Sequence, residues 1–513
     1  MAASGSVVPR KEARVLIFSI FIAGVCSIIY ELLIATTSSY FLGDSITQFS
    51  ITIGVYMAAM GVGSYLSRFF TDKKLLENFI LIELMLGVTG GLCVPLLYAS
   101  FAYTGYFQLS SLVMTVAIGV FIGLEIPLLS RLMKDYYTLK DNISNVMSLD
   151  YSGALLATLA FPFILLPLMG TFKSSIFFGL VNMSIAVVIL WCFAPGMGKS
   201  RLRILQAYLA LSVLFLATLF MFSNVLLKEW SNSLYTDRII YTKETPYQKI
   251  VMTKYKNDFR LFLNGNLQFS SIDEYRYHEA LVHVPVNLAD SVEKVLILGG
   301  GDGLVVRELL KYPLISSIDL VDLDPVMSKL GKEHPYLRAL NKSSLHNKKV
   351  SIKNQDAFVY LNNSSHRYDL IIIDLPDPNN TALARLYSKE FYRLVKNSLN
   401  SQGLFVTQAT SPFFAKEAFW TMFETIKSTG FVQVAPYHVN VPSFGEWGFI
   451  IGSREKRDIN NISLNIETRY LSEKTLSRLW QFEKDLSYVG VQVSTIDNPK
   501  ILEAYLKGWV YWN

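Results

Sequence analysis

The stretch Val295-Leu296-Ile297-Leu298-Gly299-Gly300-Gly301-Asp302-Gly303 decides the fold of the carboxy-terminal half. Its four apolar residues predict a buried strand, and the glycines after it allow a tight turn into a helix that we expect to run through Leu310. Further predicted strands follow at Ile318–Leu323, Val350–Lys353, Leu370–Ile373 and Leu404–Thr407, with a helix near Ser388–Leu399. This alternation of strands and helices predicts a mostly parallel α/β sheet with right-handed crossovers.

Acidic residues follow several of these strands, and ligands of such sheets bind at the carboxyl ends of the strands. Asp322 ends the second strand about 20 residues beyond the glycine loop, where an acid can hold both ribose hydroxyls. Asp302, inside the loop, would repel a pyrophosphate, so it favours a sulfonium nucleoside with a cationic amine over a dinucleotide. Asp356 follows another strand, where it can accept the adenine amino group. The loop Asp374-Leu375-Pro376-Asp377-Pro378 directs two more acids into the same crevice.

The segments on either side of this domain differ from it. Residues 227–292 predict a linker and a small β-domain, because the apolar run Lys249–Thr253, the turn at Lys256-Asn257-Asp258 and the turn Asn264-Gly265 read as hairpins. The α/β domain is expected over 293–455. Residues 456–513 are expected to be a helical extension, without chemistry of its own.

The first 226 residues have a different composition. Charged residues make up 17% of the chain against a usual share of about 25%, and the deficit is concentrated here. A bilayer core needs about 20 apolar residues per helix. We expect seven membrane-spanning helices, at Val15–Ala35, Phe49–Leu66, Phe79–Tyr98, Leu112–Leu129, Val146–Met169, Ile176–Phe193 and Ile204–Leu226.

The loops between these runs carry a topology signal. Lysine and arginine gather in alternate loops, which by the positive-inside rule places the amino terminus in the cytoplasm of a multi-pass protein of the cell (inner) membrane. Seven spans would then place the carboxy-terminal half outside, away from nucleosides made in the cytosol. The side on which the catalytic domain lies therefore stays open.

Three acids, Glu31, Glu83 and Glu125, lie inside the apolar runs. Ionisable groups at that depth are costly and often mark a pathway or binding site. The alternative is that they are hydrogen-bonded or protonated and hold helices together, and both interpretations stay open.

Several motifs together resemble the spermidine synthase family. They are the glycine loop with Arg307-Glu308, Tyr247-Gln248-Lys249-Ile250-Val251, Asp273-Glu274-Tyr275-Arg276-Tyr277-His278-Glu279, Asp356-Ala357, the aspartate–proline loop and Tyr387-Ser388-Lys389-Glu390-Phe391-Tyr392. The similarity covers roughly residues 240 to 455, in the family's order. The apolar half resembles the membrane module fused to some bacterial members, through Ile29-Tyr30-Glu31, Gly123-Leu124-Glu125-Ile126-Pro127 and Asp150-Tyr151-Ser152-Gly153-Ala154.

The resemblance implies a Rossmann-like, class I methyltransferase-like fold and an aminopropyltransferase. Decarboxylated S-adenosylmethionine would serve as co-substrate, with no permanently bound cofactor and no metal, and would donate its aminopropyl group to a diamine, putrescine by default. The implied catalytic base is Asp374. The implied amine site comprises Tyr277, His278, Asp302 and Asp377, and the implied nucleoside site comprises Gln248, Gly299, Gly301, Asp322, Asp356 and Ala357. A homodimer is expected by resemblance only.

The sequence departs from the family pattern mainly around the acceptor. Leu375 and Pro376 replace two serines, Phe444 lies near a substrate-contacting tyrosine of the family, and Asp322 replaces a glutamate. Three other functions stay open: aminopropyl transfer to a lipid or other membrane-borne amine, methyl transfer from intact S-adenosylmethionine, and a polyamine transporter or sensor. The net charge of +6 does not call for a nucleic acid, and the three cysteines have no zinc-site or disulfide spacing.

Overall fold

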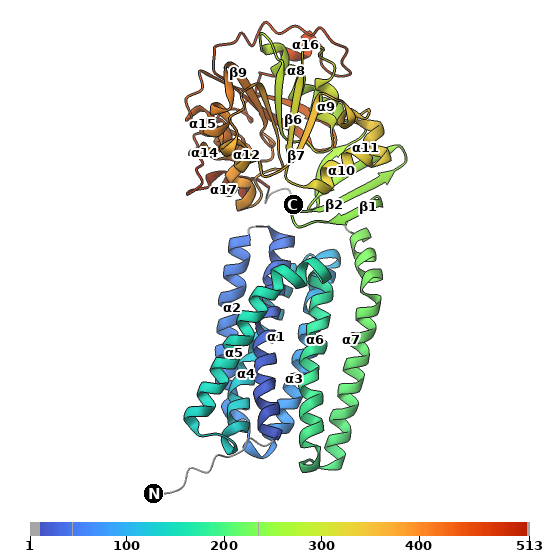
Figure 1. The fold of residues 1–513 in the computed structure, drawn as a ribbon, viewed down its shortest axis with the longest axis vertical. Helices are drawn as coiled ribbons and strands as arrows, with labels where there is room; N and C mark the ends of the chain where they lie inside the picture. The colour runs from blue at the N-terminus through green and yellow to red at the C-terminus, as the bar shows by residue number, and fades with distance from the viewer. Residues whose placement is uncertain (1–10, 44, 234, 510–513) are drawn as a thin grey trace. The chain divides into compact units, whose positions relative to one another are not determined.

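The computed structural model describes residues 11–43, 45–233 and 235–509. The chain divides into two compact units, Met1–Thr236 and Asp237–Asn513. The first unit is helical (Figure 1). Its long helices are α1 (Lys11–Leu42), α2 (Ser45–Leu66), α3 (Leu75–Tyr103), α4 (Phe107–Leu132), α5 (Leu139–Ala160), α6 (Leu166–Phe193) and α7 (Lys199–Ser233).

In the described part of the chain, six helices are long and apolar enough to cross a membrane, against the seven expected. The difference lies in Leu139–Phe193, which counts as one helix of 55 residues. A straight helix of that length would extend about 80 Å. Instead, a π-helical turn at Phe161–Leu165 precedes Gly170, whose non-helical φ of 68° breaks the helix between the fifth and sixth predicted spans. Figure 1 accordingly shows α5 and α6 as two separate helices.

Small residues let these helices pack closely. A Cβ on Gly63 of α2 would lie 2.1 Å from the Val120 carbonyl oxygen of α4, and one on Gly123 would lie 2.1 Å from the Met60 oxygen. Backbone contact of this kind gives helices dispersion energy without large side chains.

Two of the three acids in the apolar runs are fully buried. Glu83 and Glu125 are buried, whereas Glu31 is partly exposed. The Asn182 side chain of α6 donates hydrogen bonds to the Glu83 carboxylate at 2.8 Å and to its carbonyl at 3.1 Å, which joins α3 to α6.

The second unit begins with a four-stranded antiparallel sheet, in the order β1-β2-β3-β4. The strands are β1 (Arg238–Glu244), β2 (Lys249–Tyr255), β3 (Asp258–Leu263) and β4 (Asn266–Ser270). The turns between β2, β3 and β4 lie where the sequence predicted them. Helix α8 (Glu274–Leu288) follows, so Tyr277 and His278 lie on a helix, in a region where the sequence predicted only a linker and β-strands.

The main sheet has seven strands in the order β10-β11-β9-β8-β5-β6-β7. They are β5 (Lys294–Gly299), β6 (Ser317–Asp322), β7 (Val350–Asn354), β8 (Tyr368–Asp374), β9 (Leu399–Gln408), β10 (Gln433–Val441) and β11 (Gly445–Ser453). Strands β7, β6, β5, β8 and β9 are parallel, and β11 pairs antiparallel with both β9 and β10. The predicted Rossmann-like sheet is therefore present.

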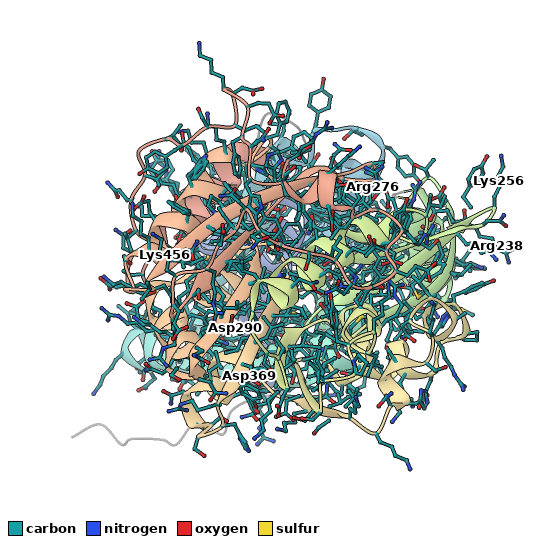
Figure 2. The ribbon with its side chains drawn as sticks, turned by 90° about the horizontal axis from the view of Figure 1, so that it is seen from above. Arg238, Lys256, Arg276, Asp290, Asp369 and Lys456 are labelled. Atoms are coloured by element: carbon teal, nitrogen blue, oxygen red, sulfur yellow. The ribbon has the colours of Figure 1, made fainter. Side chains whose placement is uncertain are left out.

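Helices cover both faces of this sheet, and alternate residues of each strand enter different cores. Leu296 and Ile371 pack with α12 (Ala357–Asn363), α14 (Lys389–Asn397) and α15 (Lys416–Lys427). Val295 and Ile372 pack with α8 and α9 (Leu304–Leu309). Burial on both faces explains the continuous apolar runs from which the strands were predicted. Charged side chains lie on the outside of the unit, including Arg238 and Lys256 of the small sheet (Figure 2).

The prediction of a helical tail was wrong for most of its length. Only α16 (Glu473–Leu476) and α17 (Lys500–Trp509) are helical in the described part of residues 456–513. The chain between them runs as turns and irregular segments against the α/β domain. For example, the His438 amide donates to the Leu479 carbonyl, and the Trp420 indole donates to the Leu486 carbonyl. These contacts with the domain satisfy backbone groups that a helix would have satisfied internally.

Candidate active site

A cavity of about 450 Å³ lies at the carboxyl ends of β5, β6 and β8. Strand order reverses between β5 and β8, which is where open α/β sheets bind ligands. The cavity is lined by all eleven site residues predicted from the sequence: Gln248, Tyr277, His278, Gly299, Gly301, Asp302, Asp322, Asp356, Ala357, Asp374 and Asp377.

The glycine loop is held between two of the acids. Gly299 pairs with Asp374 across the parallel strands and has a φ of 87°; a Cβ there would lie 2.0 Å from the Asp374 carbonyl oxygen. A Cβ on Gly301 would lie 2.6 Å from Oδ2 of Asp322. Because Gly299 and Gly301 have no side chains, Asp374, the glycine loop and Asp322 can lie close together along one wall of the cavity.

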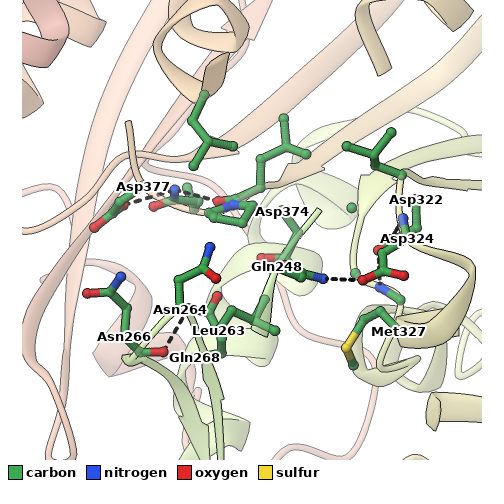
Figure 3. Close-up of a pocket in the computed structure, with 18 of the residues that line it drawn as sticks. Gln248, Leu263, Asn264, Asn266, Gln268, Asp322, Asp324, Met327, Asp374 and Asp377 are labelled. Atoms are coloured by element: carbon green, nitrogen blue, oxygen red, sulfur yellow. Dashed lines mark hydrogen bonds between the residues drawn. The ribbon is translucent and has the colours of Figure 1, made fainter. Parts of the chain in front are cut away.

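Asp322 forms one end of the cavity (Figure 3). Its two carboxylate oxygens accept the backbone N–H groups of Gly301 at 3.1 Å and Asp324 at 2.9 Å. The Gln248 amide donates to the Asp324 carboxylate at 3.0 Å, so Gln248 reaches this end from the small sheet. Burial raises the pKa of Asp322 to about 7.

Asp356 and Ala357 lie at the start of α12. One carboxylate oxygen of Asp356 accepts the Val359 N–H at 3.0 Å and caps the helix, while the other pairs with Arg385. Each oxygen keeps one further lone pair for a ligand.

The centre of the cavity contains Asp374 and Asp302. The Tyr277 hydroxyl donates to Oδ1 of Asp374 at 2.6 Å, and the Leu304 N–H donates to Asp302 at 2.9 Å. Burial raises the pKa of Asp302 to about 6, and the nearby Asp374 charge adds to this effect. Burial also raises the pKa of Asp374, against the opposing effects of His278 and the Tyr277 hydrogen bond.

His278 lies beside Asp302 and Asp374 and carries a positive charge. Its Nδ1 lies 2.7 Å from the Glu274 carboxylate, which also pairs with Arg307 at 2.7 Å. Burial alone would lower the pKa of His278, but the Glu274 carboxylate raises it to about 9. The ring is therefore an imidazolium at neutral pH, and its charge favours the ionised forms of Asp302 and Asp374.

Asp377 forms the far end of the cavity, and two side chains donate hydrogen bonds to its carboxylate. The Gln408 amide and the Thr410 hydroxyl each donate at 3.1 Å, and the Tyr505 side chain of α17 lines the same cavity. Gln408 also donates to the Leu375 carbonyl at 2.7 Å, which braces the loop between the two acids. Burial raises the pKa of Asp377 to about 6.

The sequence analysis did not name several of these residues, among them Gln408, Asp324 and Tyr505. Gln408 ends a parallel strand, a position that could have signalled it. Asp324, between the second strand and a proline, had a helix-capping signal. Tyr505 had none; it belongs to α17, in the tail, and lines the cavity.

The sheet and the acidic cavity at the ends of its strands place the second unit in the Rossmann-like class of α/β folds. The spermine/spermidine synthase domain model matches residues 274–465. A polyamine aminopropyltransferase of Leptospira interrogans is 41% identical over 498 residues, covering 96% of this chain and 98% of its own. One from Oceanobacillus iheyensis is 38% identical and covers 97% of this chain and 98% of its own.

A solved spermidine synthase in complex with the transition-state analogue AdoDATO is 25% identical, with a TM-score of 0.44, and covers 48% of this chain and 88% of its own. The near-full-length similarity to the relatives above is decisive: this chain belongs to the polyamine aminopropyltransferases. It is a transferase, and the family's aminopropyl donor is decarboxylated S-adenosylmethionine.

Proposed function

We propose that the enzyme transfers the aminopropyl group of decarboxylated S-adenosylmethionine to putrescine, giving spermidine and methylthioadenosine. The observation that supports this most is the placement of Asp302, Asp374 and Asp377 in one buried cavity with Asp322. Carboxylates along such a cavity suit a ligand with several ammonium groups. A cavity of about 450 Å³ falls in the range of small-molecule sites.

Asp374 acts as the general base in this proposal. The acceptor nitrogen attacks the carbon next to the sulfonium, the C–N bond forms, and the C–S bond electrons go to sulfur, which becomes a neutral thioether. The attacking amine must first lose a proton, and free alkyl ammonium groups titrate near pH 10, as lysine does. The Tyr277 hydroxyl occupies Oδ1 of Asp374, which leaves Oδ2 to take the proton.

Asp302 and Asp377 bind the ammonium groups of the two substrates in this proposal. Asp302 binds the amino group of the aminopropyl chain, and Asp377 binds the distal ammonium of the diamine. Tyr277 and His278 line the amine site, and the imidazolium of His278 favours the ionised forms of Asp302 and Asp374.

The nucleoside lies at the other end of the cavity in this proposal. Asp322 accepts the ribose hydroxyls, and Gln248 supports this end through Asp324. Asp356 and Ala357 recognise the adenine edge. Gly299 and Gly301 leave room for the backbone to approach the nucleoside closely.

The donor and the acceptor can be tested in one experiment. Purified full-length protein in detergent receives decarboxylated or intact S-adenosylmethionine, with putrescine, a longer diamine or a lipid extract, and methylthioadenosine is measured. The proposal expects release only from the decarboxylated donor and with the soluble diamine. Methyl transfer from the intact donor, or release with lipid extract alone, would replace it by one of the alternatives. Nucleoside binding without any turnover would favour a sensor.

We also propose that the helical unit is embedded in a membrane, with its amino terminus in the cytoplasm. Phe163, Leu168 and Met221 are 76%, 79% and 79% exposed, and many other large apolar side chains on these helices are exposed as well. A surface of this kind is favourable in lipid and costly in water. Extraction tests this proposal: the protein should stay with membranes in alkaline carbonate and dissolve only in detergent. Release by carbonate alone would contradict it.

A further inference from the structure

Two acidic side chains lie in the core of the helical unit. Glu83 of α3 and Glu125 of α4 are 0% and 2% exposed. Among the described residues of this unit, no lysine or arginine is buried with them. The ion pairs of these helices lie at helix ends instead, as between Arg131 and Asp72. The two buried carboxyls therefore have no cationic partner in the part of the unit that the structure describes.

The packing of α3 on α1 fixes the level of Glu83 within the unit. The two helices run parallel, as the aromatic contacts near their carboxyl ends show. A Cβ on Gly90 of α3 would lie 2.3 Å from Cζ of Tyr30 on α1. Glu83 lies about two turns before Gly90 on the same face of α3, and two turns back from Tyr30 on α1 lead to Ala23.

Glu125 reaches the same level from α4. The start of α4 meets the end of α1, where the Ser111 and Ser38 hydroxyls form a hydrogen bond at 2.8 Å. Glu125 lies about four turns beyond Ser111 on the same face, and four turns back from Ser38 lead to Gly24. A Cβ on Gly24 would lie 2.8 Å from Oδ1 of Asp150, so α5 brings a third carboxyl to this level.

Several buried polar atoms near this level have no hydrogen-bond partner among the described residues. They are Oε1 of Glu83, Oε1 of Glu125, Oδ1 of Asn182 and the Tyr30 hydroxyl. The Asn182 amide nitrogen donates to the other carboxylate oxygen of Glu83 at 2.8 Å, so Oδ1 of Asn182 lies close to that carboxyl. Buried polar atoms are normally paired, and an unpaired one in an apolar core is costly. A proton on one carboxyl would remove a negative charge and supply a donor for these acceptors.

The other titratable side chains packed at this level carry no positive charge. Helices α6 and α7 contribute no buried titratable side chain in their described residues. Cysteine and tyrosine are neutral at pH 7, and a further aspartate can only add negative charge. The titratable side chains on the remaining helices are Cys26 and Tyr30 of α1, Tyr56 of α2, Cys93 of α3 and Asp150 of α5.

We propose that Glu83 and Glu125 form a proton-binding site in the core of the helical unit. Two ionised carboxylates on packed helices, in apolar surroundings and without a cation, would repel each other and both lose their hydration. Binding of one proton removes this repulsion, and the proton is exchanged as the pH changes. The inference rests on the packing of the first unit alone and is independent of aminopropyl transfer by the second unit.

The test is infrared difference spectroscopy of the full-length protein in lipid, which detects the C=O stretch of protonated carboxyls. The wild type should show such a band from glutamate at pH 7, and isotope-labelled glutamate, which shifts the band, assigns it without any variant. Glu83→Gln and Glu125→Gln keep the side-chain shape, and each should change this band. Asp141→Asn is the control on α5, since Asp141 is exposed, and it should leave the band unchanged.

The pH dependence of the band distinguishes a coupled pair from two separate structural groups. In Glu125→Gln the repulsion on Glu83 is removed, so the remaining glutamate band should disappear at a pH at least about one unit lower than in the wild type. Neither sodium ions nor putrescine, added at constant pH, should change the wild-type band.

Three results would overturn the inference. The first is the absence of a protonated glutamate band at pH 7 in the wild type. The second is an equal titration of the band in the wild type and in Glu125→Gln, which would make the two carboxyls independent. The third is loss of the band on addition of sodium ions or putrescine, which would show that the site binds one of these cations instead of a proton.

Discussion

Replacing Asp374 with asparagine should lower kcat by orders of magnitude and leave nucleoside binding intact. Asparagine has nearly the same shape, and its amide oxygen can still accept the Tyr277 hydroxyl. The backbone at this position is held by the close approach of Gly299. The substitution therefore removes the proton acceptor and little else.

The expected magnitude follows from the ionisation of the acceptor. At pH 7.5 a primary amine with a pKa near 10.4 is neutral in about one molecule in a thousand. General bases contribute about 10²–10⁴-fold to such reactions. We expect kcat to fall by about that factor, with the donor Kd changed less than about threefold.

The pH dependence of kcat/KM is a second, independent test of Asp374 as the base. Without the base, the variant must use the neutral amine from solution, so its kcat/KM for putrescine should rise about tenfold per pH unit between pH 7 and 9. The wild-type value should be flatter over this range. Turnover is followed by methylthioadenosine release, and donor binding by calorimetry.

The matched control is Asp369→Asn, on the same strand but outside the residues that line the cavity. Its carboxylate accepts the backbone N–H groups of Glu293 at 3.0 Å and Lys294 at 2.9 Å. Its kcat should stay within about threefold of the wild-type value. Near-normal turnover in Asp374→Asn, or a flat pH profile in that variant, would refute the role of Asp374.

Three further predictions concern the same cavity. Burial raises the pKa values of Asp302 and Asp377 to about 6, so kcat/KM for putrescine should fall as the pH drops below about 6 and the carboxylates become neutral; a constant value down to pH 5 would contradict this. His278→Gln removes the imidazolium that favours ionised carboxylates, so the acid limb should move to higher pH. Gly301→Ala places a Cβ 2.6 Å from the Asp322 carboxylate, so donor Kd, measured by calorimetry, should rise at least about tenfold.

His278→Gln and Gly301→Ala each have a control substitution elsewhere in the second unit. His438→Gln removes a histidine that contacts the Glu446 carboxylate at 2.5 Å and is not among the cavity-lining residues, and the acid limb should not move. Gly490→Ala adds a Cβ that meets no atom within 4 Å, and donor affinity should stay unchanged. A shift in either control equal to that in the cavity variant would show a general effect on folding.

Much of the site could be predicted from the sequence because it depends on strand ends. The glycine loop, Asp322 and Asp374 each follow an apolar run, and parallel strands bring their carboxyl ends to one edge. Local sequence therefore specified which side chains meet, although no distance between them could be known.

Contacts that depend on tertiary packing could not be predicted. Tyr505 lies in a segment without a motif, and only the docking of α17 against Ala415 brings it to the cavity. The tail was expected to be helical, yet most of its apolar residues pack on the domain as irregular chain. The charge of His278 likewise depends on Glu274, one helical turn before it, being held in place by Arg307.

Product stoichiometry tests the central claim most directly. Purified full-length protein is incubated with decarboxylated S-adenosylmethionine and putrescine, and methylthioadenosine and spermidine are both quantified by mass spectrometry, with Asp374→Asn in parallel. The account predicts equal amounts of the two products from the wild type and at least about a hundredfold less of both from the variant. Methylthioadenosine without spermidine, or equal yields from the variant, would contradict aminopropyl transfer to putrescine with Asp374 as the base.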